Sequence, residues 1–253
     1  MKPLLVVTDL DGSLLNEDYS FAEAAPALAE LRERGIPLVI NSSKSARECA
    51  WWQQQLATDG PFICENGAAI ARCNGAEILP LQQFAPPRSE VLAALRVLRG
   101  EGFEFAGFDD WSLDELVAAT GLPRHQARLA AQRQYSEPLL FGEDSTRQAA
   151  FVQRLAEFGL GASQGGRFLT VCGDSDKGKA MLALASSYSA VTLVAAGDSP
   201  NDLGMLCSAD IALLIRSKYS PSMELTGPAT VLRSEATGSR GWAQVIMKLL
   251  QEE

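Results

Sequence analysis

Three aspartates that each follow an apolar stretch are the residues of this sequence best suited to chemistry. Asp9 and Asp11 follow the expected strand 4–8, of which residues 4–7 are apolar. Asp198 follows a second apolar run, at residues 191–196, and a glycine. Because the carboxyl ends of parallel strands meet at one edge of a sheet, we expect the three carboxylates to share one small volume. Mg2+ would relieve their repulsion, since it prefers carboxylates together with a substrate phosphate, so the pattern predicts an acidic, phosphate-handling metal site.

The spacing of Asp9 and Asp11 places both side chains on the same side of an extended backbone, and Gly12 then permits a sharp turn. An ionised Asp9 could attack phosphorus and form an aspartyl-phosphate, with Asp11 as general acid and base. The alternative is a simple strand-ending turn, in which Asp and Gly are common. A calcium loop is excluded, because it needs Gly and Glu where this chain has Leu14 and Ser20.

The second acidic stretch places three oxygen-bearing side chains at the start of a predicted helix over residues 201–207. These side chains are Asp198, Asn201 and Asp202. Helix capping by Asn201 or Ser199 is an alternative explanation. A cap accounts for one of these residues but not for the whole cluster.

Two serines follow the predicted strand at residues 36–40. Ser45 and Glu48 have the spacing of a capping box, so Ser45 is accounted for as the cap of the next helix. Ser42 and Ser43 remain available to donate hydrogen bonds to a phosphate. A purely structural role is the alternative, because hydroxyl groups in strand-to-helix loops often bond the backbone.

Residues 173–180 come close to a phosphate-binding P-loop and follow a predicted strand. A true P-loop needs Ser or Thr at the position of Ala180, and two aspartates inside this loop would repel phosphate. Lys177 is better interpreted as a point charge that reaches an oxyanion, with a solvated surface lysine as the alternative. A nucleotide-binding module around this loop is therefore a less favoured hypothesis.

Composition limits the classes of function. The chain has 253 residues, of which 47% are hydrophobic, and this is enough to form a full core. Its formal net charge of -9 argues against binding nucleic acid or a membrane surface. A single histidine disfavours histidine-based triads and zinc sites. Five cysteines without close metal-type pairs fit buried, reduced thiols. We find no signal peptide or membrane-spanning run and expect a cytoplasmic protein.

Apolar runs alternate with helical patterns at both ends of the chain, which is typical of parallel βαβ units. The expected strands are 4–8, 36–40, 191–196 and 211–215, and the expected helices are 21–34, 45–56, 177–187, 201–207 and 239–251. Two prolines at 86–87 and several glycines at 159–166 bound a middle block of different texture. We predict an α/β protein with a Rossmann-like parallel sheet core, helices on both faces and an inserted α/β cap. The expected domains are a core at 1–83 and 167–253 and a cap at 84–166.

Taken in order, the segment 9–15, Ser42, Lys177 and the segment 197–202 resemble the four motifs of the haloacid dehalogenase superfamily of phosphatases. The resemblance implies that Asp9 is the nucleophile and Asp11 the acid and base. It also implies that Ser42 and Lys177 hold the phosphoryl group.

The same resemblance implies a magnesium site. Asp9, the backbone carbonyl of Asp11 and Asp198 would be the metal ligands. Asn201 and Asp202 would support the water shell of the metal.

The position of the insert, between the serine and lysine motifs, is similar to the Cof-like branch, which acts mainly on sugar phosphates. Segments 41–44, 65–68, 133–138, 166–168 and 176–180 resemble the mannosyl-3-phosphoglycerate phosphatase family. This implies a small phosphorylated sugar or sugar-glycerate as substrate, with its glycerate carboxylate near Lys44, Arg133 or Arg167. The candidate substrate contacts are Ser43, Lys44, Asn66, Arg133, Glu137 and Arg167. A hexose phosphate phosphatase and a phosphotransferase or mutase remain alternatives, and the sequence leaves the oligomeric state open.

Overall fold

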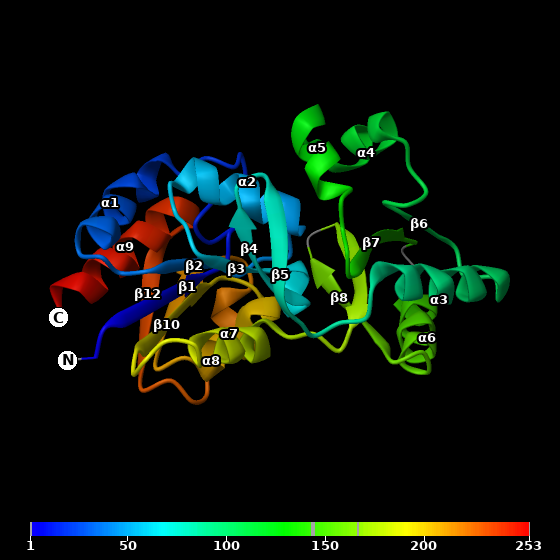
Figure 1. The fold of residues 1–253 in the computed structure, drawn as a ribbon. Helices are drawn as coiled ribbons and strands as arrows, with labels where there is room; N and C mark the ends of the chain where they lie inside the picture. The colour runs from blue at the N-terminus through cyan, green and yellow to red at the C-terminus, as the bar shows by residue number, and fades with distance from the viewer. Residues whose placement is uncertain (1, 143–144, 166, 253) are drawn as a thin grey trace.

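The computed structural model describes residues 2–142, 145–165 and 167–252 and has two lobes (Figure 1). The larger lobe contains both chain ends, and the smaller lobe is built from the middle of the chain. Short 3-10 helices connect longer elements at η1 (Ala22–Ala24), η2 (Glu65–Gly67), η3 (Pro200–Asp202) and η4 (Ser220–Ser222). Within the described residues, no helix is both long and apolar enough to cross a membrane.

A five-stranded parallel sheet forms the centre of the larger lobe, in the order β12-β11-β10-β1-β2. Its strands are β1 (Leu4–Thr8), β2 (Leu38–Ile40), β10 (Thr192–Gly197), β11 (Ile211–Arg216) and β12 (Thr230–Thr237). The neighbours β1 and β10 pair in register, Leu4 with Thr192 and Thr8 with Ala196. This pairing brings the ends of the two predicted motif strands to the same edge of the sheet.

Successive residues of a strand point to opposite faces of the sheet. Because the residues on both faces are apolar, helices cover both faces of the parallel sheet. Leu4 and Val6 belong to the cluster under α1 (Ala25–Glu33) and α9 (Gly238–Gln251). Leu5 and Val7 belong to the cluster under α7 (Lys177–Ala185) and α8 (Leu203–Ser208). The core is thus a three-layer α/β sandwich, as the continuous apolar strands predict.

A three-stranded antiparallel sheet extends the larger lobe beside β2. It consists of β3 (Pro61–Cys64), β4 (Ala69–Asn74) and β5 (Glu77–Gln83), and α2 (Ala46–Leu56) packs nearby. A single parallel bridge between Asn41 and Ile63 links it to the end of β2. The hairpin between β3 and β4 therefore lies next to the loop that follows β2.

The smaller lobe is a four-stranded antiparallel sheet in the order β6-β7-β9-β8, with helices packed against it. Its elements are α3 (Arg88–Gly100), β6 (Phe105–Gly107), α4 (Leu113–Thr120), α5 (Arg124–Ala130), β7 (Ser136–Phe141), α6 (Ser145–Ala156), β8 (Leu160–Gly165) and β9 (Phe168–Gly173). Residues of α3 and α6 form an apolar cluster with Leu139, Leu169 and Val171 of the sheet. The cap has a hydrophobic core of its own.

The α/β fold class with a parallel core sheet is confirmed, and two details differ from the sequence analysis. Strand β12 was not predicted, although its alternating burial is the period-2 pattern of a strand with one covered face. Strand β9 was placed in the core, but it pairs with β7 and β8, and Leu169 and Val171 lie in the apolar cluster of the cap. We therefore propose a cap of residues 84–173. The expected boundary at Gly166 lies outside the described residues.

Candidate active site

Asp9 directly follows β1, and the surrounding strands fix its backbone. Its N–H donates to the Ala196 carbonyl at 2.9 Å, which continues the pairing between β1 and β10. The Thr8 hydroxyl donates to the Asp9 carbonyl at 2.7 Å. The indole N–H of Trp242, from α9, donates in turn to the Thr8 hydroxyl at 2.9 Å. Hydrogen bonds that involve β1, β10 and α9 thus fix the backbone from which the Asp9 carboxylate extends.

Lys177 begins α7, which the Asp176 side chain caps. Its side chain is fully buried, and Nζ lies 2.6 Å from Asp9 Oδ1 and 2.7 Å from Asp202 Oδ1. The Asn41 amide donates to the Lys177 carbonyl at 3.0 Å and fixes the start of the helix. Burial alone would lower the pKa of Lys177, but the two carboxylates outweigh it and raise the pKa above the usual lysine value. Lys177 is therefore a buried ammonium ion.

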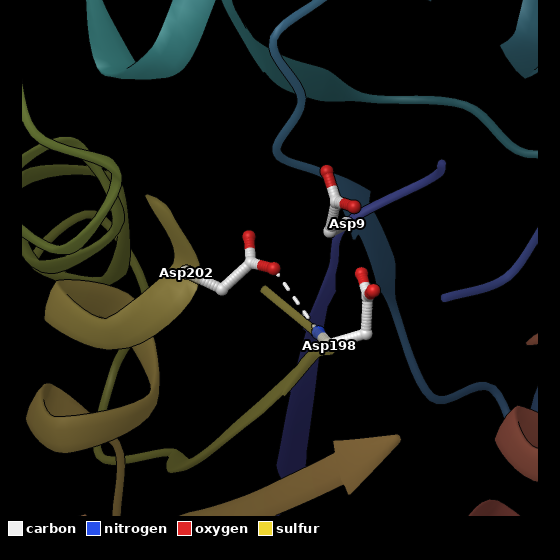
Figure 2. A group of neighbouring side chains, drawn as sticks. All are labelled: Asp9, Asp198 and Asp202. Carbon is white, nitrogen blue, oxygen red and sulfur yellow. Dashed lines mark hydrogen bonds between the residues drawn. The ribbon is translucent and has the colours of Figure 1, made fainter. Parts of the chain in front are cut away.

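Three buried carboxylates, of Asp9, Asp198 and Asp202, gather at the carboxyl edge of the parallel sheet (Figure 2). One oxygen of each lies within 4.8 Å of the others. Burial raises the pKa of Asp9 well above its usual value, because the attraction of Lys177 only partly offsets desolvation. Burial and repulsion from Asp202 raise the pKa of Asp198 to about 7. The cluster holds more negative charge than Lys177 balances, and its hard oxygen donors suit a divalent cation such as Mg2+.

The carboxylate of Asp202 is already bound within the protein. Its Oδ1 accepts from Lys177, and its Oδ2 accepts the N–H groups of Asp198 and Ser199, each at 3.1 Å. Figure 2 shows the bond from the Asp198 N–H to Asp202. Asp202 thus holds the loop after β10 and the lysine in one arrangement, and it leaves Asp9 and Asp198 as the better-placed metal ligands.

Gly12 and Ser13 shape the space around Asp198. The buried Ser13 hydroxyl donates to Asp198 Oδ1 at 3.1 Å. Gly12 has φ +80°, and a Cβ atom there would lie 2.7 Å from Asp198 Oδ2. A side chain at position 12 would therefore displace the carboxylate, so the close approach of the two motif loops depends on this glycine.

The side chain of Asp11 is not part of the buried cluster. It is 43% exposed, and its Oδ1 lies 2.9 Å from the ammonium of Lys44. The two-residue spacing alone did not reveal this partner, because Lys44 comes from the loop after β2. The contribution expected from Asp11 to metal binding was its backbone carbonyl, which remains a prediction.

The loop after β2 brings Ser42, Ser43 and Lys44 to the same edge of the sheet. Ser42 is buried, and its N–H donates to the Ile63 carbonyl at 3.0 Å. Its hydroxyl accepts the N–H of Lys44 at 3.3 Å, and its carbonyl accepts the N–H of Asn66 at 3.0 Å. These bonds fix the loop against the β3–β4 hairpin, so its side chains have defined positions.

Asn66 lies at the tip of the hairpin with φ +59°. Its Oδ1 accepts the side-chain amide of Asn201 at 3.1 Å, and the Asn201 Oδ1 accepts the Ser199 hydroxyl at 2.5 Å. Gly67 follows with φ +87°, and a Cβ atom there would lie 2.4 Å from the Asp176 carbonyl. The hairpin therefore packs tightly on the segment that leads into Lys177, and Asn66 positions Asn201.

The three predicted substrate contacts of the cap occupy different environments. The side chain of Arg133 is 5% exposed, and it donates to the Ser43 carbonyl at 2.6 Å and to the Ser136 hydroxyl at 2.9 Å. Glu137 is buried, and its Oε2 lies 2.6 Å from the guanidinium Nη2 of Arg88. Arg167 is exposed and donates to a backbone carbonyl of the cap. Arg133 thus bridges the lobes, Glu137 is bound within the cap, and Arg167 is the most accessible.

The sequence indicated Glu65 only as part of the segment 65–68, and its role as an anchor of the cap on the core was not predicted. This fully buried residue has φ +49°. Its carboxylate accepts the N–H groups of Gln134 and Tyr135 at 2.8 and 3.1 Å and the Ser136 hydroxyl at 2.5 Å. Its partners lie about seventy positions away, so no local pattern indicates the contact. An acidic residue directly after the apolar residues 61–64 was the available signal.

A model of the haloacid dehalogenase-like hydrolase family matches residues 6–218 of the chain. The chain belongs to this family. It is 34% identical over 270 aligned positions to a glucosyl-3-phosphoglycerate/mannosyl-3-phosphoglycerate phosphatase of Persephonella marina, with 98% of each chain covered. It is 35% identical to a protein of the same name from Methanococcoides burtonii, with 97% of each chain covered. The resemblance found in the sequence is thus confirmed.

Solved structures of haloacid dehalogenase-like proteins share the fold. A phosphatase of the superfamily from Bacteroides thetaiotaomicron matches with a TM-score of 0.70 and 18% identity, over 99% of this chain and 95% of that one. The prediction of an enzyme that hydrolyses phosphoric monoesters agrees with the hydrolase family and with the phosphatase names of both relatives. It is confirmed at that level.

The P-loop hypothesis does not agree with the structure. Gly173 ends a strand of the cap, and Asp176 caps the helix that follows. The ammonium of Lys177 lies between two carboxylates rather than above a loop of backbone N–H groups. The segment therefore delivers Lys177 to the acidic cluster.

Proposed function

We propose that this haloacid dehalogenase-like hydrolase is a Mg2+-dependent phosphatase that hydrolyses mannosyl-3-phosphoglycerate or its glucosyl counterpart through an aspartyl-phosphate on Asp9. One observation carries the proposal: the carboxylates of Asp9, Asp198 and Asp202 lie close together, and two of them, Asp9 and Asp202, bind the buried ammonium of Lys177. The names of the two relatives support the substrate, since both cover nearly the whole chain. A cytoplasmic location and the lack of a nucleic-acid partner stay predictions from the sequence.

The residues of the cluster fit a magnesium ion. Asp9 and Asp198, with the backbone carbonyl of Asp11, would hold it. When bound, it supplies positive charge to the oxygens of the phosphoryl group, where most of the stabilisation in phosphoryl transfer acts. Asn201 and Asp202 would order the surrounding water.

Two displacements at phosphorus complete the reaction. Asp9 forms a bond to phosphorus while the bond to the sugar-glycerate oxygen breaks, and Asp11 gives that oxygen its proton. Asp11 then removes a proton from water, the water oxygen bonds to phosphorus, and Asp9 is released with free phosphate. Lys177 and Ser42 hold the phosphoryl oxygens, and the burial of Lys177 strengthens its attraction for them.

The test is a phosphate-release assay on the purified full chain with Mg2+ and a panel of phosphorylated sugars. We expect the sugar-3-phosphoglycerates to be hydrolysed with the highest kcat/KM and chelation of divalent ions to abolish release. Acid-quenched protein should carry the mass of one phosphoryl group on the peptide that contains Asp9. A preference for simple hexose phosphates would contradict the substrate while leaving the phosphatase class intact.

A phosphotransferase or mutase with the same fold would be distinguished from a phosphatase by its product. Such an enzyme would pass the phosphoryl group from Asp9 to an added sugar and release little free phosphate. Measurement of both products with excess acceptor sugar distinguishes the two, and the proposal requires free phosphate to dominate.

A further inference from the structure

Lys44 and Asp11 form an ion pair in which the lysine is buried and the aspartate faces solvent. The side chain of Lys44 is 7% exposed, whereas that of Asp11 is 43% exposed, and their charged atoms lie 2.9 Å apart. An ammonium that is almost completely removed from water needs an anionic partner. The carboxylate that supplies this partner is the more accessible half of the pair, so it is the half that another anion could replace.

Lys44 is held in place by groups other than Asp11. Its N–H donates to the Ser42 hydroxyl at 3.3 Å, and its carbonyl accepts the Glu65 N–H at 2.9 Å. Its ammonium lies 4.8 Å from the centroid of the Tyr19 ring, a cation–π contact. The backbone bonds fix the residue, and the ring of Tyr19 gives the ammonium a contact that does not depend on Asp11.

The observed pairing occupies one oxygen of the carboxylate that is expected to act as acid and base. Proton transfer requires its carboxylate within hydrogen-bond reach of the oxygen that leaves phosphorus. In this structure Oδ1 of the carboxylate is directed to the ammonium of Lys44. Release of Asp11 without a replacement would leave the buried ammonium of Lys44 without its ion-pair partner, with the Glu48 carboxylate as the remaining anion that acts on it, and this is costly.

We propose that Lys44 exchanges its partner on substrate binding: the carboxylate of a phosphorylated sugar-glycerate replaces Asp11 on the ammonium and frees Asp11 for proton transfer. The inference rests on the proposed function and adds a device for substrate choice. A sugar phosphate without a second anionic group cannot make the exchange. Lys44 thus contributes to specificity by binding the carboxylate and, through Asp11, by positioning the acid and base.

The test compares two substrates that differ at one group. One is glucosyl-3-phosphoglycerate, and the other is its analogue with a hydroxymethyl group in place of the carboxylate. For the wild-type enzyme with Mg2+, kcat/KM should favour the carboxylate by about tenfold to a hundredfold, the range of a charge-assisted hydrogen bond. Lys44→Met should remove most of this ratio, and Lys44→Arg, which keeps the charge, should restore a large part of it.

Lys179→Met is the matched control. Lys179 is also a lysine close to the site in sequence, but its pair with Asp174 at 3.2 Å is exposed. Its loss changes the net charge equally and should leave the ratio between the two substrates unchanged. Equal losses for both substrates in Lys44→Met would overturn the proposal, because they would show a general structural or catalytic role.

A second measurement uses the unmodified protein and does not depend on the folding of a variant. Free glycerate should inhibit the hydrolysis of an aryl phosphate at a concentration at least about tenfold lower than glycerol does. Equal inhibition by the two compounds would contradict the exchange. If the wild-type enzyme hydrolyses the aryl phosphate but neither sugar-glycerate analogue, the proposed substrate fails, and the exchange fails with it.

Discussion

The buried charges of the core and those of the cap are arranged differently. In the core, three carboxylates lie close together, and only two of them, those of Asp9 and Asp202, bind Lys177. In the cap, the buried Glu137 is bound to Arg88 at 2.6 Å and accepts the Asp109 N–H at 2.7 Å. Burial raises the pKa of Glu137 as it does for Asp9 and Asp198, but the charged neighbours of Glu137, Arg88 and Arg133, oppose the shift, whereas neighbouring aspartates add to it in the core.

This difference separates a site from a structural contact. Paired charges in the cap satisfy one another, so they stabilise a position without calling for a ligand. The core cluster keeps an excess of negative charge even with Lys177 present, and such an excess is relieved by a cation or a proton. An unbalanced buried cluster is therefore the stronger indication of function. The predictions below test this contrast, from the largest expected effect to the smallest.

Asp9→Asn should reduce phosphate release by roughly 10^4-fold or more, because an amide cannot act as the nucleophile. Steady-state release and the acid-quenched phosphoprotein should be measured on the same preparation. The variant should bind Mg2+ at least weakly, since Asp198 remains. Near-normal activity would rule out covalent catalysis at this residue.

Lys177→Met should lower the free energy of unfolding by about 3–5 kcal/mol, because it leaves buried carboxylates without their cation. Urea unfolding without divalent ions measures this loss, and added Mg2+ should recover part of it. Lys179→Met, whose ion pair is exposed, should change the stability by less than about 1 kcal/mol. A loss equally small in both variants would show that the cluster does not depend on Lys177.

The stability of the metal-free protein should fall as the pH rises from about 4 to about 7. The pKa of Asp198 is raised to about 7 from the ordinary value of 3.8, so protonation favours the folded state below pH 4, and this contribution is lost as the pH approaches 7. The difference is on the order of 4 kcal/mol, at ~1.36 kcal/mol per pKa unit.

Mg2+ should therefore stabilise the protein more at pH 7.5 than at pH 5, because it takes the place of the proton. Thermal unfolding with and without chelator at both pH values measures this, with Asp198→Asn as the control that flattens the dependence. A stabilisation by Mg2+ that does not change with pH would contradict the account of the cluster.

Glu137→Gln should lower the free energy of unfolding by about 2 kcal/mol, the size of a lost charge-assisted bond to Arg88, with kcat on an aryl phosphate unchanged. Arg154→Met, in an exposed pair with Glu101, should leave the free energy of unfolding nearly unchanged. An increased KM for the sugar-glycerate in Glu137→Gln would instead show that Glu137 contacts substrate, as the sequence resemblance implies.

The sequence alone determined the local elements and the chemical type of the site. Strand 4–8 and the capping box of Ser45 with Glu48 are found as predicted, because continuous apolar runs and cap spacing act over a few residues. The motif order also identified the family. These features depend on residues close together in the chain.

Only the tertiary structure decided which groups meet. The pairing of Lys44 with Asp11, the bonds of Glu65 to the cap and the membership of β9 in the cap sheet all join segments that lie far apart in the chain or have equivalent local patterns. A buried charge takes its partner from whichever element packs against it, and an apolar strand pairs with whichever edge is open. The spacing of residues along the chain does not indicate which partner is taken in either case, so these contacts depend on the packing of the whole chain.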